Sequence, residues 1–199
     1  YGDHRDLHLS IRRQRQMCIR DRWEVFTMAA NVRGSGKVVT ISEHGDLVKC
    51  AKGLRIQSDY SFGEAPALDV ILVPGGMGTR TEVNNKVVID WIAKVAPGCI
   101  WVTSVCTGSM LLIESGVARG KRVTTHWAFV DTLRERGGAA TVVDDMRFVR
   151  DGNIVSSAGV SAGIDMSLWI IGQTDSPAFA REVQKRIEYY PAPPYTSDV

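Results

Sequence analysis

Short apolar runs alternate with stretches of helical periodicity along most of the chain, beginning at Trp23. Runs typical of strands cover 37–42, 69–73, 100–105, 122–125, 147–149 and 154–156, the last two flanking a hairpin signal, Asp-Gly-Asn. Helical periodicity covers 23–34, 82–95, 109–115, 127–136, 164–172 and 177–189. Buried apolar strands that alternate with helices predict an α/β fold with an open, mostly parallel sheet between helical layers.

The 199 residues suit one domain with a substantial core. No apolar run reaches the length of a transmembrane helix, and no secretory signal is visible, so we expect no membrane partner. The cysteines are Cys18, Cys50, Cys99 and Cys106, and none form a C-x-x-C pair that would indicate zinc or a redox dithiol. This cysteine usage favours a reducing, cytoplasmic location.

Residues 1–22 differ from the rest of the chain in hydrophobic pattern and in charge. Their apolar residues follow neither a helical nor a strand period. They carry six arginines and three aspartates, a net charge of +3, whereas the whole chain carries +2. We therefore divide the chain into an atypical basic tail, 1–22, of non-native or truncated origin, and a domain, 23–199. Since the basic excess belongs to the tail, the domain has no basic stripe that would indicate a nucleic-acid partner.

Cys106 stands where an apolar β-branched run, 100–105, stops and a Thr-Gly-Ser turn opens a helix. A strand, a sharp turn and a helix with a thiol at the corner match the geometry of a nucleophile elbow. The helix N-terminus would favour the thiolate over the thiol. The pattern alone leaves a second interpretation open, that Cys106 is a buried core cysteine.

Glycines at the end of a second strand strengthen the catalytic interpretation. The run 69–73 stops at Pro74-Gly75-Gly76, and glycines at a strand end let the backbone approach a ligand with exposed N–H groups. Ligand sites in such sheets lie beyond the carboxyl ends of the strands. The N–H groups of Gly76 and Thr107 are therefore candidates to stabilise an anionic adduct at Cys106.

Four motifs in order resemble the ThiJ/PfpI superfamily, the class I glutamine amidotransferase-like group that includes the parkinsonism-associated protein. They are Leu68-Asp69-Val70-Ile71-Leu72-Val73-Pro74-Gly75-Gly76, Ser104-Val105-Cys106-Thr107-Gly108-Ser109, Thr124-Thr125-His126-Trp127, and Ser157-Ala158-Gly159 with Ala162-Gly163-Ile164-Asp165-Met166. The resemblance implies a flavodoxin-like three-layer sandwich. The second and third motifs are most similar to the isonitrile hydratase branch, to which sensor domains of AraC-type regulators are related. We expect a stand-alone protein, since no helix-turn-helix follows Pro194.

Departures from the superfamily pattern argue against two of the activities found in the superfamily. Peptidase-like members place His directly after the nucleophile, where this chain has Thr107, and glutaminases need a downstream His-x-Glu, whereas His126 precedes Trp127-Ala128. Family members also begin with an apolar strand and a turn that presents an acid to the cysteine. The segment 17–22 offers neither, and Asp21 falls too close to the next helix to match that acid.

The resemblance implies a hydratase-type lyase that converts an isonitrile, a small molecule, into an N-substituted formamide. Cys106 would be the nucleophile, Gly76 and Thr107 N–H groups would stabilise the adduct, and the Thr107 hydroxyl would position water, relay a proton or simply cap its helix. His126 is a possible base but is favoured as a structural residue, and Asp165 is expected to cap a helix. We expect no cofactor and no metal, and the resemblance implies a homodimer. Alternatives are a glyoxalase or deglycase activity on reactive carbonyls and a non-enzymatic ligand- or redox-sensing domain.

Overall fold

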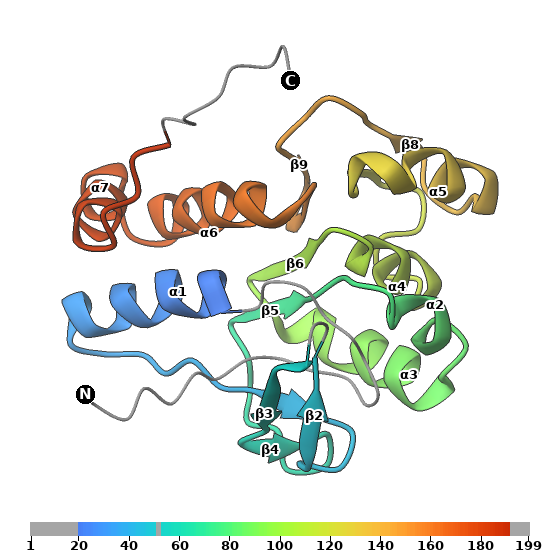
Figure 1. Ribbon diagram of the computed structural model, residues 1–199, viewed down its shortest axis with the longest axis horizontal. Coiled ribbons are helices and arrows are strands. Elements are labelled where there is room, and N and C mark those ends of the chain that lie inside the picture. The colour runs from blue at the N-terminus through green and yellow to red at the C-terminus, as the bar shows by residue number, and fades with distance from the viewer. Residues whose placement is uncertain (1–19, 51–52, 192–199) are drawn as a thin grey trace.

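A four-stranded sheet forms the centre of the fold in the computed structural model, which describes residues 20–50 and 53–191 (Figure 1). Its strands, in spatial order, are β5 (Val70–Val73), β6 (Trp101–Val105), β10 (Ile154–Ser157) and β9 (Phe148–Asp151). The first three are parallel, and β9 joins β10 as an antiparallel hairpin. The predicted α/β fold with a mostly parallel sheet is confirmed, as is the hairpin.

Three two-stranded sheets complete the β structure of the described residues. They are β1 (Ile41–Ser42) with β4 (Tyr60–Ser61), parallel; β2 (Leu47–Lys49) with β3 (Arg55–Gln57), antiparallel; and β7 (Arg122–Val123) with β8 (Thr141–Val142), parallel. The β2–β3 hairpin was not predicted, because strands of three residues with one buried position each leave almost no periodicity in the sequence.

Helices cover both faces of the central sheet and give the predicted three layers (Figure 1). One layer holds α1 (Arg20–Arg33), α6 (Val160–Thr174) and α7 (Pro177–Arg186); the other holds α2 (Thr79–Glu82), α3 (Lys86–Val95), α4 (Gly108–Glu114) and α5 (Val130–Arg136). Met166 and Ile170 of α6 pack with Trp101 and Val155 on one face of the sheet. The larger core, on the opposite face, joins α3, α4 and α5 to the sheet.

Several element boundaries differ from those predicted, for local reasons. The helix expected over 82–95 is two helices, because the Asn85 side chain accepts the N–H of Val87 and caps a new helix. The strand expected over 37–42 is confined to Ile41–Ser42. The helix expected from Ile164 begins at Val160, and the one expected from Trp127 opens with a 3-10 turn, Trp127–Phe129.

Helix α1 begins at Arg20, so it includes the last residues of the segment that the sequence analysis set apart as a tail. The Arg22 side chain is only 2% exposed, and its Nη1 donates to the carbonyl of Val160 at 3.2 Å. Asp21 lies in the first turn of α1. Residues 1–19 lie outside the described part of the chain, and the domain boundary at Trp23 stays a prediction.

A cavity of about 460 Å³ separates the β1–β4 pair from the central sheet. Val39 and Ile41 line one side, and Val70 and Leu72 of β5 line the other. Within the described residues, β5 pairs only with β6 and β1 only with β4, so both strands turn an edge toward this cavity.

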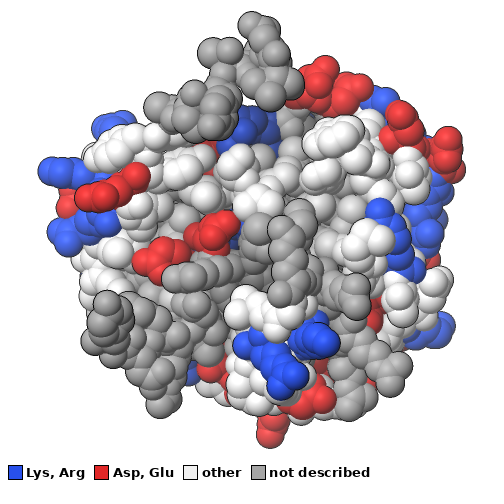
Figure 2. Space-filling model, in the orientation of Figure 1, with Lys and Arg blue, Asp and Glu red and all other residues white. Residues whose placement is uncertain are grey.

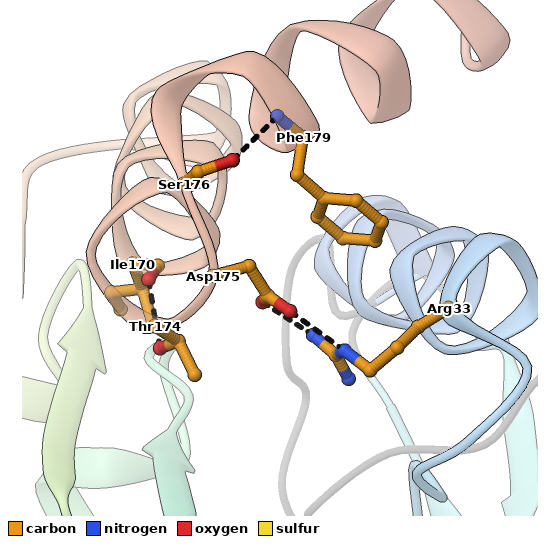
Figure 3. A network of polar contacts seen from close by, with 6 residues as sticks. All are labelled: Arg33, Ile170, Thr174, Asp175, Ser176 and Phe179. Carbon is orange, nitrogen blue, oxygen red and sulfur yellow. Dashed lines mark hydrogen bonds and ion pairs between the residues drawn. The ribbon is translucent and has the colours of Figure 1, made fainter.

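Arg33 of α1 and Asp175 at the end of α6 both line this cavity and form an ion pair (Figure 3). Nε and Nη2 of Arg33 donate to Oδ1 and Oδ2 of Asp175 at 2.8 and 2.6 Å. The Arg33 guanidinium also lies 5.5 Å from the centre of the Phe179 ring, and Ser176 caps α7 through the N–H of Phe179. We call Arg33 and Asp175 the α1 clamp; its two-point geometry fixes the orientation of α1 as well as its position.

Candidate active site

The carboxyl ends of β5, β6 and β10 meet at one edge of the sheet. The register pairs Val73 with Ser104 and Val105 with Ser157, so the three strands end level with one another. The loops that follow begin at Pro74, Cys106 and Ala158 and are therefore neighbours in space. This is the edge at which open α/β sheets bind ligands.

Cys106 adopts a left-handed backbone conformation, with φ of 56°. A non-glycine residue rarely takes this conformation, and it persists only where surrounding contacts hold it. Here the Cys106 N–H donates to the carbonyl of Ala158 at 2.7 Å, and its own carbonyl accepts from Oγ1 of Thr125 at 2.9 Å. The predicted strand–turn–helix corner is present, and contacts from two other loops fix it.

The glycine loop after β5 lies against this corner with no room for side chains. A Cβ on Gly75 would come within 2.7 Å of both the Cβ of Cys106 and the N of Thr107. A Cβ on Gly108 would come within 2.3 Å of the carbonyl of Val73. Such distances exclude any side chain unless the backbone shifts, so both glycines are needed for the close approach.

The hydroxyl of Thr107 faces the glycine loop. The N–H of Gly76 donates to Oγ1 of Thr107 at 2.9 Å, and that hydroxyl lies 3.1 Å from the carbonyl of Gly76. Oγ1 of Thr79 lies 2.9 Å from Oγ1 of Thr107. Thr107 occupies the N-cap position of α4 but makes no side-chain capping bond, so capping is not what its hydroxyl does here.

Burial raises the pKa of the Cys106 thiol above its ordinary value, and this effect outweighs the others. Hydrogen bonds from the N–H and the hydroxyl of Thr107 lower the pKa, as do the positive charges of Arg22 and Arg80. The sequence analysis expected the helix N-terminus to favour the thiolate; desolvation reverses the net direction. Both charged side chains that act on this thiol are arginines.

His126 makes a hydrogen bond within its own loop. Its Nδ1 accepts the N–H of Ala128 at 3.2 Å and caps the 3-10 turn that follows. Its ring lies beside that of Trp127, with centroids 5.6 Å apart. The interpretation of His126 as a structural residue stays a prediction.

Asp165 does not cap a helix, contrary to the sequence-based expectation. It lies inside α6, whose N-cap is Gly159, because the helix begins earlier than predicted. Its carboxylate instead accepts from Nε of Arg147 and from the hydroxyl of Tyr189, the latter at 2.8 Å. Asp165 of α6 thus contacts Arg147, the residue before β9, and Tyr189, three residues after the end of α7.

Four residues at the site were not singled out from the sequence. Thr79 and Thr125 anchor Thr107 and the Cys106 carbonyl, and Arg22 and Arg80 bring positive charge. Thr125 lies in the third superfamily motif, and Thr79 follows the glycine loop by three residues. The sequence therefore contained a weak indication that both lie near the site. Arg22 was assigned to the tail, and its partner Val160 is 138 residues away in sequence.

Other chemistry at the described residues is limited. Cys50 and Cys99 are buried free thiols whose pKa values are raised by burial. Over residues 20–50 and 53–191, no group of three or more His, Cys, Asp or Glu is placed to hold a metal ion.

Within the same ranges no helix combines the length and apolarity needed to cross a membrane. Basic and acidic side chains are interspersed on the face shown in Figure 2.

Comparison with known proteins gives a consistent family match. The model of the DJ-1/PfpI family matches residues 20–173. The chain is 42% identical over 150 residues to isonitrile hydratase of Pseudomonas putida, covering 75% of this chain and 64% of that enzyme. It is 31% identical over 167 residues to protein DJ-1alpha of Drosophila melanogaster, covering 80% of this chain and 76% of that protein.

Less similar relatives include proteins with other activities. The chain is 29% identical to the transcriptional regulator CdhR of Pseudomonas aeruginosa, of which it covers 43%, and 26% identical to the glutathione-independent glyoxalase DJR-1.2 of Caenorhabditis elegans, of which it covers 77%. Among solved structures, a ThiJ/PfpI family protein from Pseudomonas syringae superposes with a TM-score of 0.82 at 28% identity, covering 98% of this chain and 79% of that one.

Proposed function

Because the chain belongs to the DJ-1/PfpI family, we propose that it is a cysteine-dependent hydratase that converts an isonitrile and water into an N-substituted formamide. The similarity to isonitrile hydratase supports this choice, and the chain spans somewhat less than two thirds of that enzyme's length. The observation that carries the proposal is the Cys106 thiol, held in a left-handed turn with the N–H and hydroxyl of Thr107 beside it.

The first step joins Cys106 to the terminal carbon of the isonitrile. The sulfur lone pair forms the S–C bond, and the proton that leaves the thiol ends on the same carbon, giving a thioimidate. This step needs a proton as well as a nucleophile. A thiol whose pKa is raised by burial still holds its proton at neutral pH, so Cys106 supplies both.

The second step adds water across the C=N bond of the thioimidate. Oxygen bonds to carbon, one proton goes to nitrogen, and the C–S bond then breaks to release the formamide. The proton of the new hydroxyl returns to sulfur and regenerates the thiol. Overall, one isonitrile and one water give one formamide, and no oxidant or reductant is required.

We propose that Thr107 moves the proton in both steps. Its hydroxyl rotates about one bond, and it can donate either to the Gly76 carbonyl or to the sulfur. General acid–base help of this kind contributes ~10²–10⁴-fold to a rate. In the resting site the N–H of Gly76 donates to Thr107, and in the proposal this N–H donates to the adduct once the hydroxyl moves away. The proposal uses no proton transfer by His126, whose Nδ1 caps the turn after it.

A direct assay distinguishes this activity from the alternatives. The purified chain is incubated with p-nitrophenyl isocyanide, and the formamide is quantified by liquid chromatography and mass spectrometry, with Cys106→Ala as the control. We expect formamide from the unmodified chain alone. Equal product from Cys106→Ala would overturn the proposal. Methylglyoxal consumption without formamide would favour the glyoxalase alternative, for which the relative from Caenorhabditis elegans provides the precedent.

A sensing role is the third candidate. The relative in a transcriptional regulator favours it, as does the finding that, within residues 20–50 and 53–191, the charges that act on Cys106 include no carboxylate. A folded protein that turns over neither substrate but whose Cys106 reacts with peroxide would support that role. A homodimer and a cytoplasmic location also remain proposals; sedimentation that shows monomer alone at micromolar concentration would contradict the first.

A further inference from the structure

Two large apolar side chains are exposed on the loops that hold Cys106. Met77 is 63% exposed and directly follows Gly76, and Trp127 is 81% exposed and directly follows His126. A single exposed apolar residue is ordinary on a protein surface. These two are of interest because each belongs to a loop whose neighbouring residues contact the elbow.

Hydrogen bonds fix both loops to the elbow. The N–H of Gly76, one residue before Met77, donates to Thr107 at 2.9 Å. The hydroxyl of Thr125, two residues before Trp127, donates to the carbonyl of Cys106 at 2.9 Å. Met77 and Trp127 therefore extend from backbone positions that cannot move far from the thiol.

Arg80 contacts both Met77 and Phe129. Nη1 of Arg80 lies 3.2 Å from Sδ of Met77, and its guanidinium lies 5.0 Å from the centre of the Phe129 ring. Phe129 itself is a core residue and only 4% exposed, whereas Arg80 is exposed and its positive charge acts on the Cys106 thiol. We call the exposed side chains of Met77, Arg80 and Trp127 the rim.

The chemistry of the rim suits the face of an aromatic ring. An indole ring favours offset or edge contacts with another ring, a guanidinium is attracted to a ring face, and a thioether sulfur contacts rings favourably. Each of these groups also contributes apolar area that a bound ring would remove from water. A small alkyl group contributes only the removal of apolar area from water.

On this basis, and resting on the hydratase chemistry proposed above, we propose that the rim binds an aromatic group of the substrate, so that the site favours aryl isonitriles over small alkyl isonitriles. The C≡N–R unit is linear. When its terminal carbon contacts the Cys106 sulfur, R lies farther from the sulfur along the same line, and we place it at the rim. Met77 and Trp127 are then specificity-determining residues that take no part in the chemical steps.

The kinetic test compares phenyl isocyanide with cyclohexyl and ethyl isocyanide. For Trp127→Ala we expect kcat/KM for the phenyl substrate to fall about tenfold, which corresponds to roughly 1.4 kcal/mol of lost contact. The ethyl substrate should change less than about twofold, because it does not reach the rim. Trp127→Phe should recover most of the phenyl activity. The matched control is Leu47→Ala, which removes an exposed side chain on the distant β2–β3 hairpin. An equal loss on all three substrates would overturn the proposal.

A second measurement does not depend on hydratase activity. N-phenylmaleimide and N-methylmaleimide both alkylate thiols: sulfur bonds to one alkene carbon, and the thiol proton goes to the other. The two rates at Cys106 are followed by peptide mass spectrometry. We expect the phenyl reagent to react faster in the unmodified chain and Trp127→Ala to remove most of this preference. If Cys106 prefers the phenyl reagent and no isonitrile is hydrated, the proposal that the rim binds an aromatic group is supported and the hydratase proposal is contradicted. Equal rates in the unmodified chain would overturn the rim.

Discussion

Gly76 and Thr107 exchange hydrogen bonds in both directions. The N–H of Gly76 donates to Oγ1 of Thr107 at 2.9 Å, and the Thr107 hydroxyl is 3.1 Å from the Gly76 carbonyl oxygen that can accept its proton. The pair connects the loop after β5 to the elbow after β6. The same hydroxyl lowers the pKa of Cys106, so one side chain both holds the two loops together and acts on the Cys106 sulfur.

Removing this hydroxyl should impair the chemistry more than the fold. Thr107→Val keeps the shape of the side chain but leaves the Gly76 N–H unpaired, which costs about 1–3 kcal/mol of stability. We expect isonitrile hydration to fall at least about 100-fold. Thr107→Ser, which restores the hydroxyl, should stay within about tenfold of the unmodified chain. Thermal unfolding of each variant separates the two effects, and full activity in a folded Thr107→Val protein would exclude the proton-relay role.

Alkylation of Cys106 should depend on pH in a specific direction. Burial raises the pKa of the thiol, so the thiolate fraction is small at neutral pH and grows as pH rises through the raised pKa. The midpoint of the iodoacetamide rate should therefore lie above the ordinary value of roughly 8.5. Arg80→Gln removes a positive charge that lowers this pKa, so its midpoint should lie higher still.

Peptide mapping of the same reactions identifies the thiol that reacts. With less than one equivalent of iodoacetamide we expect Cys106 to be labelled ahead of Cys50 and Cys99, which are 2% and 6% exposed. Preferential labelling of Cys50 or Cys99 would show that the elbow thiol is not the reactive one.

The close approach of the glycine loop to the elbow should be intolerant of a methyl group. Gly75→Ala places a Cβ within 2.6 Å of the Val105 carbonyl, so we expect a loss of about 1–3 kcal/mol in unfolding free energy together with loss of activity. Gly98→Ala is the matched control, because nothing lies within 4 Å of its added Cβ. Chemical denaturation measures both. Equal stabilities for the two variants would mean that the loop relaxes at little cost.

Glu82 should make the protein less stable as pH rises. Burial raises the pKa of this carboxyl, the nearby Glu43 raises it further, and a hydrogen bond from Asn85 opposes them. A carboxyl whose folded pKa is raised stabilises the fold below its unfolded pKa, and this contribution is lost as pH increases through the folded pKa. We expect Glu82→Gln to raise the melting temperature at pH 7 and to lose that advantage near pH 4. Glu135→Gln, at an exposed position on α5, should show neither effect.

The sequence predicted the central sheet and the elbow because their signals are local. An apolar run that stops at Cys106 and another that stops at Pro74 define two strand ends, and the parallel fold brings those ends together. Contacts between distant segments could not be predicted in this way. The Arg22 contact with α6 joins residues 138 apart, and the net rise in the Cys106 pKa depends on burial that no short pattern reports.

The cavity between β1 and β5 offers a place for the apolar first strand that family members carry and that the sequence analysis did not find in 17–22. An apolar strand of about five residues with an acid-bearing turn, grafted ahead of Arg20 where α1 begins, should pair with the edges of β1 and β5 that have no partner within the described residues and fill the cavity. We expect a higher melting temperature and faster isonitrile hydration, with Cys106→Ala abolishing the activity. Hydrogen exchange at Val70 and Leu72 amides reports on the added pairing. A graft that folds and leaves both exchange and melting temperature unchanged would contradict this placement.

The α1 clamp has a consequence for behaviour in concentrated solution. An open strand edge is a template for pairing with another chain, and α1 lines the cavity that holds the β5 edge. Arg33 and Asp175 hold the C-terminal end of that helix through an ion pair that is 35% and 21% exposed, and therefore within reach of screening by salt. We expect weakening of this pair to loosen α1 beside the β5 edge, whose only partner within the described residues is β6. Association between molecules through β5, measured by light scattering, should therefore increase with ionic strength.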